Sequence, residues 1–142
     1  RALGSVIEKE IVASAHGIYR GGLGVHLTMV AMGGDLGMKV DLALVPACAS
    51  HADRPSVQVN RIDTLLFSES AGRFIVTIDP ENRKTFEDIF KGLPCSCIGV
   101  ITDKSGDLVI SDSKNRGKSK IIISIPVQDL KAAWKKPFGG LI

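Results

Sequence analysis

Apolar residues recur with helical spacing at the start of the chain, at Ala2, Val6, Ile7 and Ile11, and this pattern predicts a helix. No Ser, Thr, Asp or Asn precedes the pattern as a cap. A native helix start usually carries such a cap, so we expect the polypeptide to continue on the N-terminal side of these residues.

A second stretch, from Gly22 to Gly33, is apolar nearly all round a helix, which predicts a buried helix. A glycine-rich loop enters this buried helix, and we expect the loop to come directly after the first helix. The glycines expected to end the buried helix and form the next turn are Gly33, Gly34 and Gly37. An alternating strand over Lys39 to Leu44 should follow, and then a long surface connection over residues 45–59, which contains two prolines.

The second half of the chain predicts short helices and strands in mixed order. The expected helices are Asn60–Phe67, one that starts at Asp79-Pro80-Glu81 and ends at Gly92, and Val127–Lys135. The expected strands are Phe74–Ile78, Ser96–Thr102, Leu108–Ser111 and Lys120–Ile125. The elements do not alternate strictly as βαβ. They therefore predict an α+β fold, a layered sandwich in which helices flank a mixed sheet.

Composition limits the class of protein. The chain has 142 residues, 44% of them hydrophobic, and a formal net charge of +3, which fits one soluble domain and excludes disordered, collagenous and coiled-coil classes. The densest basic segment, Lys114 to Lys120, is short and lacks aromatic residues, so we expect no nucleic-acid partner. No apolar run is long enough to span a membrane and no secretory signal is visible.

The cysteines and the tryptophan are expected to be structural. Cys48, Cys95 and Cys97 form no zinc-binding pattern, so we expect small apolar fillers in or beside strands and a reduced, cytoplasmic setting. Trp134 is expected to anchor the core or an interdomain contact rather than to stack on a ligand.

The first candidate site is the glycine-rich loop from His16 to Gly24. Backbone N–H groups at a helix N-terminus attract anions, and Arg20 adds a cation beside Gly21 and Gly22. The loop lacks the spacing of a phosphate-binding P-loop. An alternative interpretation is that Gly21 and Gly22 only permit a sharp turn with close packing.

The second candidate site follows the short helix, in residues 67–74. Glu69, Ser70 and Arg73 place two charges and a hydroxyl group before a strand, where they are suited to a phosphate or a sugar. The alternative is a local Glu69–Arg73 ion pair with serines capping a turn. The histidines at 16, 26 and 51 are scattered in the sequence and suggest no triad or metal site, and His26 is expected to be packed on the buried helix.

Taken together, the two segments AHGIYRGGLGVHLTMVAMGGDLG (15–37) and TLLFSESAGRFIVTI (64–78) resemble the C-terminal domain of the aminoimidazole ribonucleotide synthetase superfamily. Within it they are most similar to the last domain of phosphoribosylformylglycinamidine synthase large subunits. The order of elements agrees with that family over nearly the whole chain, and the resemblance implies a PurM-like C-terminal-domain fold.

The resemblance implies a part in an ATP-dependent ligase of purine biosynthesis, which converts formylglycinamide ribonucleotide to its amidine with glutamine-derived ammonia. It implies that this chain, residues 1–142, is the C-terminal half of the second repeat of a larger subunit. The implied partners are the N-terminal remainder of that subunit, a glutaminase subunit and a small accessory subunit. ATP and magnesium are the implied cofactors of the full enzyme.

The catalytic residues of that family lie in N-terminal halves, so the resemblance assigns none to this chain, and we expect the isolated chain to be inactive. Where family members carry an acidic residue in the glycine loop, this chain has Arg20, and Ala71 replaces a family glutamine. The resemblance thus implies a second, pseudo-symmetric anion or nucleotide site. Its expected residues are Arg20, Gly21, Gly22, Glu69, Ser70 and Arg73. Alternatives are the C-terminal domain of another superfamily member, of the thiamine-monophosphate kinase or hydrogenase maturation factor type, or a stand-alone binding module.

Overall fold

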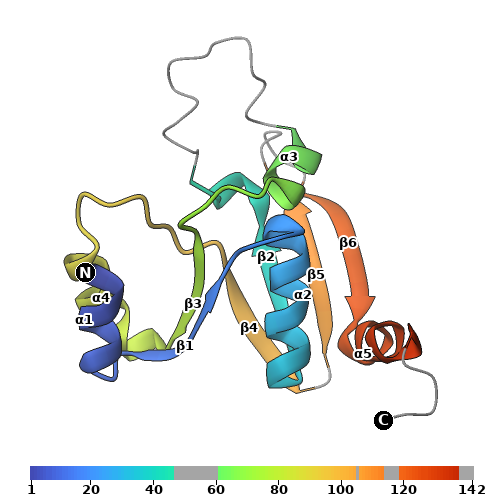
Figure 1. The fold of residues 1–142 in the computed structure, drawn as a ribbon, viewed down its shortest axis with the longest axis horizontal. Coiled ribbons are helices and arrows are strands. Elements are labelled where there is room, and N and C mark those ends of the chain that lie inside the picture. Colours follow the sequence, from blue (N-terminus) through green and yellow to red (C-terminus); the bar gives the residue numbers. More distant parts are fainter. Residues whose placement is uncertain (47–60, 105, 114–118, 138–142) are drawn as a thin grey trace.

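The structure is a computed structural model and describes residues 1–46, 61–104, 106–113 and 119–137. It contains a four-stranded sheet and a separate two-stranded ribbon, with helices packed against both (Figure 1). The α-helices are α1 (Ala2–Glu8), α2 (Gly22–Gly34), α3 (Ile62–Phe67), α4 (Arg83–Ile89) and α5 (Val127–Lys135). The strands are β1 (Val12–Gly17), β2 (Leu36–Asp41), β3 (Phe74–Ile78), β4 (Gly99–Lys104), β5 (Asp107–Asp112) and β6 (Lys120–Pro126).

The larger sheet has the strand order β4-β2-β5-β6 and is mixed. Strands β2 and β5 run parallel, with Met38 opposite Leu108 and Val40 opposite Ile110. The neighbouring pairs, β2 with β4 and β5 with β6, are antiparallel. The expected α+β fold with helices against a mixed sheet is therefore confirmed.

Helix α2 packs on this sheet and forms the main core with it. Leu23, Leu27 and Ala31 are buried on the side of the helix that faces the strands. The outer side of α2 differs from the sequence expectation, because Val25 is exposed and Met29 and Met32 are only partly buried. Apolar residues surround the helix, but within the described residues the larger sheet covers one side of it.

The end of α2 is formed differently from the prediction. Gly33 and Gly34 continue the helix, and Asp35 adopts the left-handed cap conformation with φ 54°. Gly37 lies in β2, where an added Cβ would come 2.4 Å from the Thr102 side chain. Strand β2 ends at Asp41, and Leu42–Leu44, where the sequence predicts that the strand continues, form a 3-10 helix.

The ribbon pairs β1 with β3 in antiparallel register, with Gly17 opposite Phe74. Sequence reasoning missed β1 and expected a helix directly before the glycine loop. Ala13, Ser14 and Ala15 are exposed on a strand whose only described partner is β3, so β1 lacks the alternation of apolar and polar residues that identifies a half-buried strand.

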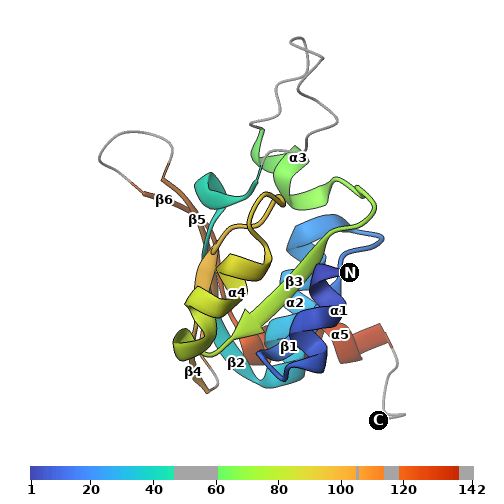
Figure 2. The same ribbon diagram turned by 90° about the vertical axis from the view of Figure 1, so that its left-hand side faces the viewer.

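Helices α1 and α4 pack against the ribbon and form a second, smaller core (Figure 2). Val6, Ile11 and Phe86 are its buried residues, and Phe86 stacks on Phe90 with ring centroids 4.5 Å apart. The predicted helix start at Asp79-Pro80-Glu81 is confirmed as a 3-10 turn, Pro80–Asn82, that leads into α4.

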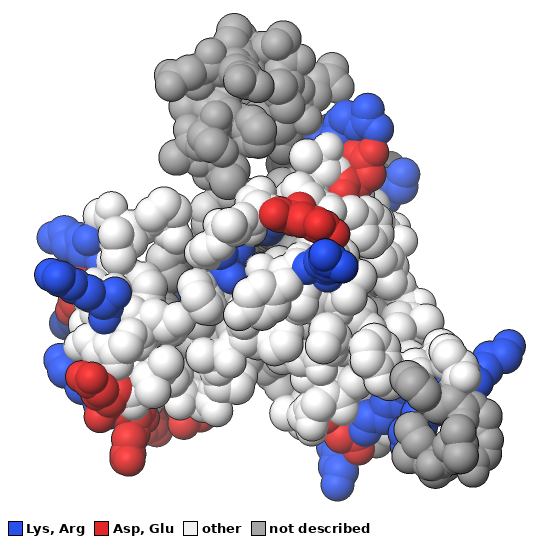
Figure 3. All heavy atoms as spheres, viewed as in Figure 1, with Lys and Arg blue, Asp and Glu red and all other residues white. Residues whose placement is uncertain are grey.

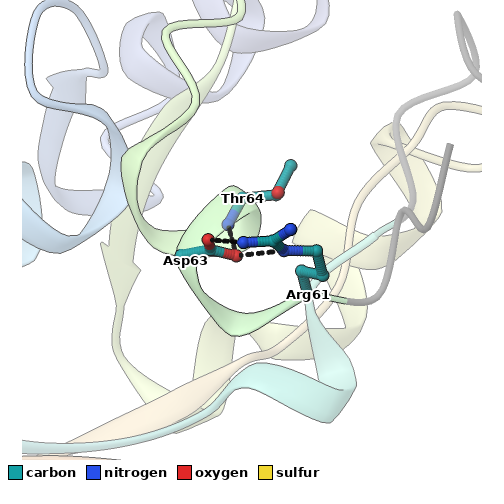
Figure 4. Close-up of polar contacts among 3 residues, drawn as sticks. All are labelled: Arg61, Asp63 and Thr64. Atoms are coloured by element: carbon teal, nitrogen blue, oxygen red, sulfur yellow. Dashed lines mark hydrogen bonds and ion pairs between the residues drawn. The ribbon is translucent and has the colours of Figure 1, made fainter.

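Helix α3 leads toward the second candidate loop. Its first turn is organised by Asp63, whose carboxylate accepts hydrogen bonds from the Arg61 guanidinium and from the Thr64 backbone N–H at 2.9 Å (Figure 4). The Arg61 side chain holds the pKa of the Asp63 carboxyl below its ordinary value. This acidic residue in the first turn also suits the positive end of the helix dipole.

Several other expectations are corrected or lie outside the described residues. Trp134 is 54% exposed, so it is not a core residue of this domain. Cys95 and Cys97 are exposed free thiols rather than fillers. The Cys95 thiol is still partly desolvated by its neighbours, which raises its pKa. Cys48, most of the connection over 45–59 and most of the basic segment fall outside the described residues. No helix in the described part of the chain is long and apolar enough to cross a membrane.

Candidate functional site

The structure brings the two predicted loops together. Strand β1 ends at Gly17 and pairs with the first residue of β3, Phe74. Just beyond this pair, the Ile18 backbone N–H donates to the Arg73 carbonyl oxygen at 2.9 Å. The glycine loop and the loop that precedes β3 therefore leave the ribbon side by side, although they are far apart in the sequence.

A hydrogen bond joins the loops at their tips. The Gly21 backbone N–H donates to Oε1 of Glu69 at 2.8 Å. Arg73 instead donates from Nη1 to the carbonyl and hydroxyl oxygens of Ser68, at 3.5 Å and 3.4 Å. The local Glu69–Arg73 ion pair that the sequence offered as an alternative is thus replaced by a bond between the loops.

Gly22 is a position in the glycine loop that requires glycine. Its φ is +70°, and an added Cβ would lie 2.7 Å from the Leu66 carbonyl oxygen and 2.7 Å from the Phe67 carbonyl carbon. The beginning of α2 can approach the end of α3 this closely because Gly22 lacks a side chain. Its N–H donates to the Tyr19 carbonyl oxygen at 3.2 Å, so the turn is also closed internally.

Two histidines form hydrogen bonds that support the glycine loop. The Tyr19 backbone N–H donates to Nε2 of His26 at 2.9 Å, and Nδ1 of His26 lies 2.8 Å from Nε2 of His16. Nε2 of His26 also lies 3.2 Å from the Arg20 carbonyl oxygen. In the neutral ring whose Nε2 accepts the shorter bond from Tyr19, the proton resides on Nδ1, which donates to His16. His26 is only 5% exposed. Both of its ring nitrogens nevertheless have hydrogen-bond partners within the fold.

Sequence reasoning placed His26 correctly in a packed position but missed its partnership with His16. The two residues lie on β1 and α2, and their spacing of ten positions matches no local pattern. Only the pairing of β1 with β3, together with the turn into α2, places their rings 5.0 Å apart. No motif in the sequence identifies this contact.

Charge near the loop tips is mixed. Red and blue side chains lie next to each other over the N-terminal end of α2 (Figure 3). Arg20 and Glu69 are exposed and Ser70 and Arg73 are partly exposed. Arg20 forms no salt bridge with the described residues. All six predicted residues thus lie in the two adjoining loops or at the first residue of α2, and Arg20 presents there a cation that has no salt bridge within the described part of the chain.

The described residues do not fit a divalent metal. No three or more His, Cys, Asp or Glu side chains within the described ranges form a group that holds a metal ion. Arg20 also puts a cation into the glycine loop. A carboxylate already bonds to Gly21, but one carboxylate with Arg20 nearby is a poor ligand set for magnesium.

Comparison with known proteins gives the family. The family described as "AIR synthase related protein, C-terminal domain" matches residues 1–111. The phosphoribosylformylglycinamidine synthase subunit PurL of Synechocystis is 32% identical over 126 residues, which is 87% of this chain and 14% of the relative. PurL of Limosilactobacillus reuteri (strain DSM 20016) is 38% identical over 99 residues, 70% of this chain and 11% of the relative.

Solved structures give the same fold. Thermotoga maritima PurL complexed with ATP aligns with a TM-score of 0.67 at 20% identity, covering 91% of this chain and 20% of that chain. The same protein complexed with FGAR aligns with a TM-score of 0.66 at 21% identity and the same 91% of this chain. The chain therefore spans only a small part of the proteins that it matches.

Proposed function

Since the chain belongs to the AIR synthase related protein, C-terminal domain family, we propose that it is a domain of a phosphoribosylformylglycinamidine synthase large subunit. The complete enzyme would convert formylglycinamide ribonucleotide to its amidine, with ATP and with ammonia from glutamine. The supporting observation is that relatives 32% and 38% identical over most of this chain are PurL subunits.

In this proposal residues 1–142 form one domain, the C-terminal half of the second repeat of that subunit. The N-terminal remainder, a glutaminase subunit and a small accessory subunit are its partners in the cytoplasm. The domain alone performs no chemistry, because the family's catalytic residues have no counterparts in it. Its part in the enzyme is structural.

The loop pair is proposed as a pseudo-symmetric anion or nucleotide site. Arg20 supplies an exposed cation without a salt bridge among the described residues. Arg73 supplies a second guanidinium from the adjoining loop, where it donates to Ser68. The Gly21 and Gly22 amides and the Ser70 hydroxyl complete the set. The Gly22 N–H donates to the Tyr19 carbonyl oxygen at 3.2 Å, so a phosphate has to compete with that bond. The Glu69 carboxylate accepts the hydrogen bond of the Gly21 N–H at 2.8 Å. An entering phosphate therefore has to share that N–H with the carboxylate or displace it.

Because the described residues do not fit magnesium, no step is assigned to a metal at this loop. ATP, when bound by the complete enzyme, supplies the phosphoryl group that activates the amide oxygen. What these residues would do is bind and orient phosphate oxygens through Arg20 and Arg73, since guanidinium groups form paired hydrogen bonds with phosphate.

The enzyme proposal is tested with the full-length polypeptide that contains this chain. The purified protein is incubated with formylglycinamide ribonucleotide, ATP, magnesium and ammonium chloride, and the amidine is measured by mass spectrometry. Product formation by the full-length protein, and none by residues 1–142 alone, is expected. An inactive full-length protein contradicts the assigned reaction, and turnover by the isolated chain contradicts the structural role.

The loop site is tested by titrating the full-length protein with inorganic phosphate and with ADP while the Gly21 and Gly22 amides are followed by selectively labelled NMR. Shifts that saturate are expected, and Arg20→Ala should weaken binding by about tenfold, the loss expected for one charge-assisted contact. Arg61→Ala is the matched control, because Arg61 is paired with Asp63 away from the loop tips. Unchanged amide signals at saturating ligand contradict the site.

A further inference from the structure

A groove separate from the loops lies between α2 and α5. It has a volume of about 360 Å³ and is lined by Met29, Met32, Gly33, Lys131, Trp134 and Lys135. The residues of α2 that line the groove belong to the C-terminal half of that helix, whereas the two loops meet at its N-terminal end (Figure 1). The groove therefore serves no part of the proposed anion site.

The apolar face of α5 continues past the core into this groove. Val127 is fully buried and Leu130 packs against the main core, but Trp134, further along the same face, is 54% exposed. Met29 and Met32 on the outer side of α2 are only partly buried. Large apolar side chains from both helices thus meet at a surface that nothing within the described residues covers.

The groove is held open in a defined shape. Asp35, directly after α2, accepts hydrogen bonds from Lys131 Nζ at 2.6 Å and from Gln128 Nε2 at 2.8 Å. Both donors belong to α5, so these bonds set the spacing of the two helices beside the groove. Gly33 adds room, because a Cβ built there meets nothing within 4 Å.

We propose that this groove docks a segment of the same polypeptide that lies outside these 142 residues. This inference rests on the proposed function, in which the chain is one domain of a longer subunit. The docked segment presents an apolar side chain to Trp134 and the two methionines, and a carboxylate to Lys135.

Length and charge both favour this occupant. The chain covers only 14% of the Synechocystis relative, so most of such a subunit lies outside it and is available to cover the groove. Lys131 is engaged by Asp35, whereas Lys135 forms no salt bridge among the described residues and is exposed. A second copy of this chain would bring the same lysines to the same contact, and like charges facing each other oppose such pairing.

The test uses the full-length polypeptide, in its native assembly, with Trp134 replaced by the photo-crosslinking residue p-benzoylphenylalanine. Mass spectrometry after irradiation identifies the attached peptide. We expect a crosslink to a peptide of the same polypeptide outside these 142 residues.

Gly33→Leu adds a large apolar side chain at a residue that lines the groove, starting from a Cβ position that meets nothing within 4 Å. It should reduce the crosslink yield by about tenfold, as loss of one apolar contact surface predicts. Gly4→Leu is the matched control, because Gly4 is also helical and a Cβ there also meets nothing within 4 Å. The control should leave the yield unchanged, and circular dichroism should confirm that both variants are folded.

A crosslink to a second copy, a crosslink to another protein or no crosslink overturns the inference, as does an equal yield in Gly33→Leu. These outcomes leave the proposed function intact if the full-length protein makes the amidine. A coding sequence that ends close to these 142 residues overturns both.

Discussion

The backbone N–H of Gly21 donates to the carboxylate of Glu69 over 2.8 Å, although the two residues are 48 positions apart in the sequence. This bond joins the glycine loop to the loop before β3. It makes Glu69 the internal partner of an amide that sequence reasoning assigned to an external anion.

Glu69→Ala should loosen the tip of the glycine loop. With its acceptor removed, the Gly21 amide should exchange with solvent about tenfold faster in hydrogen–deuterium exchange. The free energy of unfolding should fall by about 0.5–1 kcal/mol, because the bond is exposed. Glu8→Ala, at an exposed position at the end of α1, is the control and should change neither quantity. Unaltered Gly21 exchange in Glu69→Ala would show that the carboxylate does not hold the loop.

His26→Phe should be more costly, because it leaves a partly buried N–H without an acceptor. The Tyr19 N–H, now 2.9 Å from Nε2 of His26, loses its partner while the ring volume is nearly kept. We expect the free energy of unfolding in urea to fall by about 1–3 kcal/mol. His16→Gln leaves the Tyr19 bond intact and keeps a side-chain oxygen that can accept from Nδ1 of His26, so it should lose less. Equal losses in the two variants would contradict the assigned role of His26.

Two glycines of the same helix should respond to alanine in opposite directions. Gly22→Ala forces a Cβ to within 2.7 Å of the Leu66 carbonyl oxygen at a φ of +70°, and should destabilise the fold by about 3 kcal/mol. Gly33→Ala, where a Cβ meets nothing within 4 Å, should stabilise it by about 0.5–1 kcal/mol through helix propensity. Urea unfolding of both variants checks the pair, and a tolerated Gly22→Ala would refute the close approach of α2 and α3.

The Asp35–Lys131 bond predicts a pH dependence. The hydrogen bond from Lys131 lowers the pKa of Asp35 in the folded protein, so the bond stabilises the fold above the unfolded pKa, about 3.9. That contribution disappears as the pH falls through the lower folded pKa. Asp35→Asn keeps the left-handed backbone, which asparagine tolerates, but removes the charge.

Asp35→Asn should therefore be less stable than the parent protein at neutral pH. The gap should begin to narrow below about pH 4 and then close. Urea unfolding at several pH values measures it. Asp88→Asn, at an exposed position of α4, should show no such convergence. A gap in Asp35→Asn that is constant from neutral to acid pH would rule out the charge as its cause.

Much of the fold could be predicted because the responsible interactions are local. Helix α5 covers Val127–Lys135 and β3 covers Phe74–Ile78, the same bounds that periodicity predicts. Apolar spacing and turn residues act within a few positions, so they are visible in the sequence. The missed strand β1 is stabilised mainly by its pairing with β3, and its own residues carry no strand pattern.

The sequence by itself determined most of the elements, though not β1, together with the α+β class and the residues of the two loops. The tertiary structure decided which groups meet. Glu69 bonds to Gly21 rather than to Arg73, His16 meets His26, and Trp134 remains exposed in a groove. Each of these depends on how the ribbon, α2 and α5 pack together. The atoms involved come from distant parts of the chain, and such contacts leave no spacing or periodicity in the sequence.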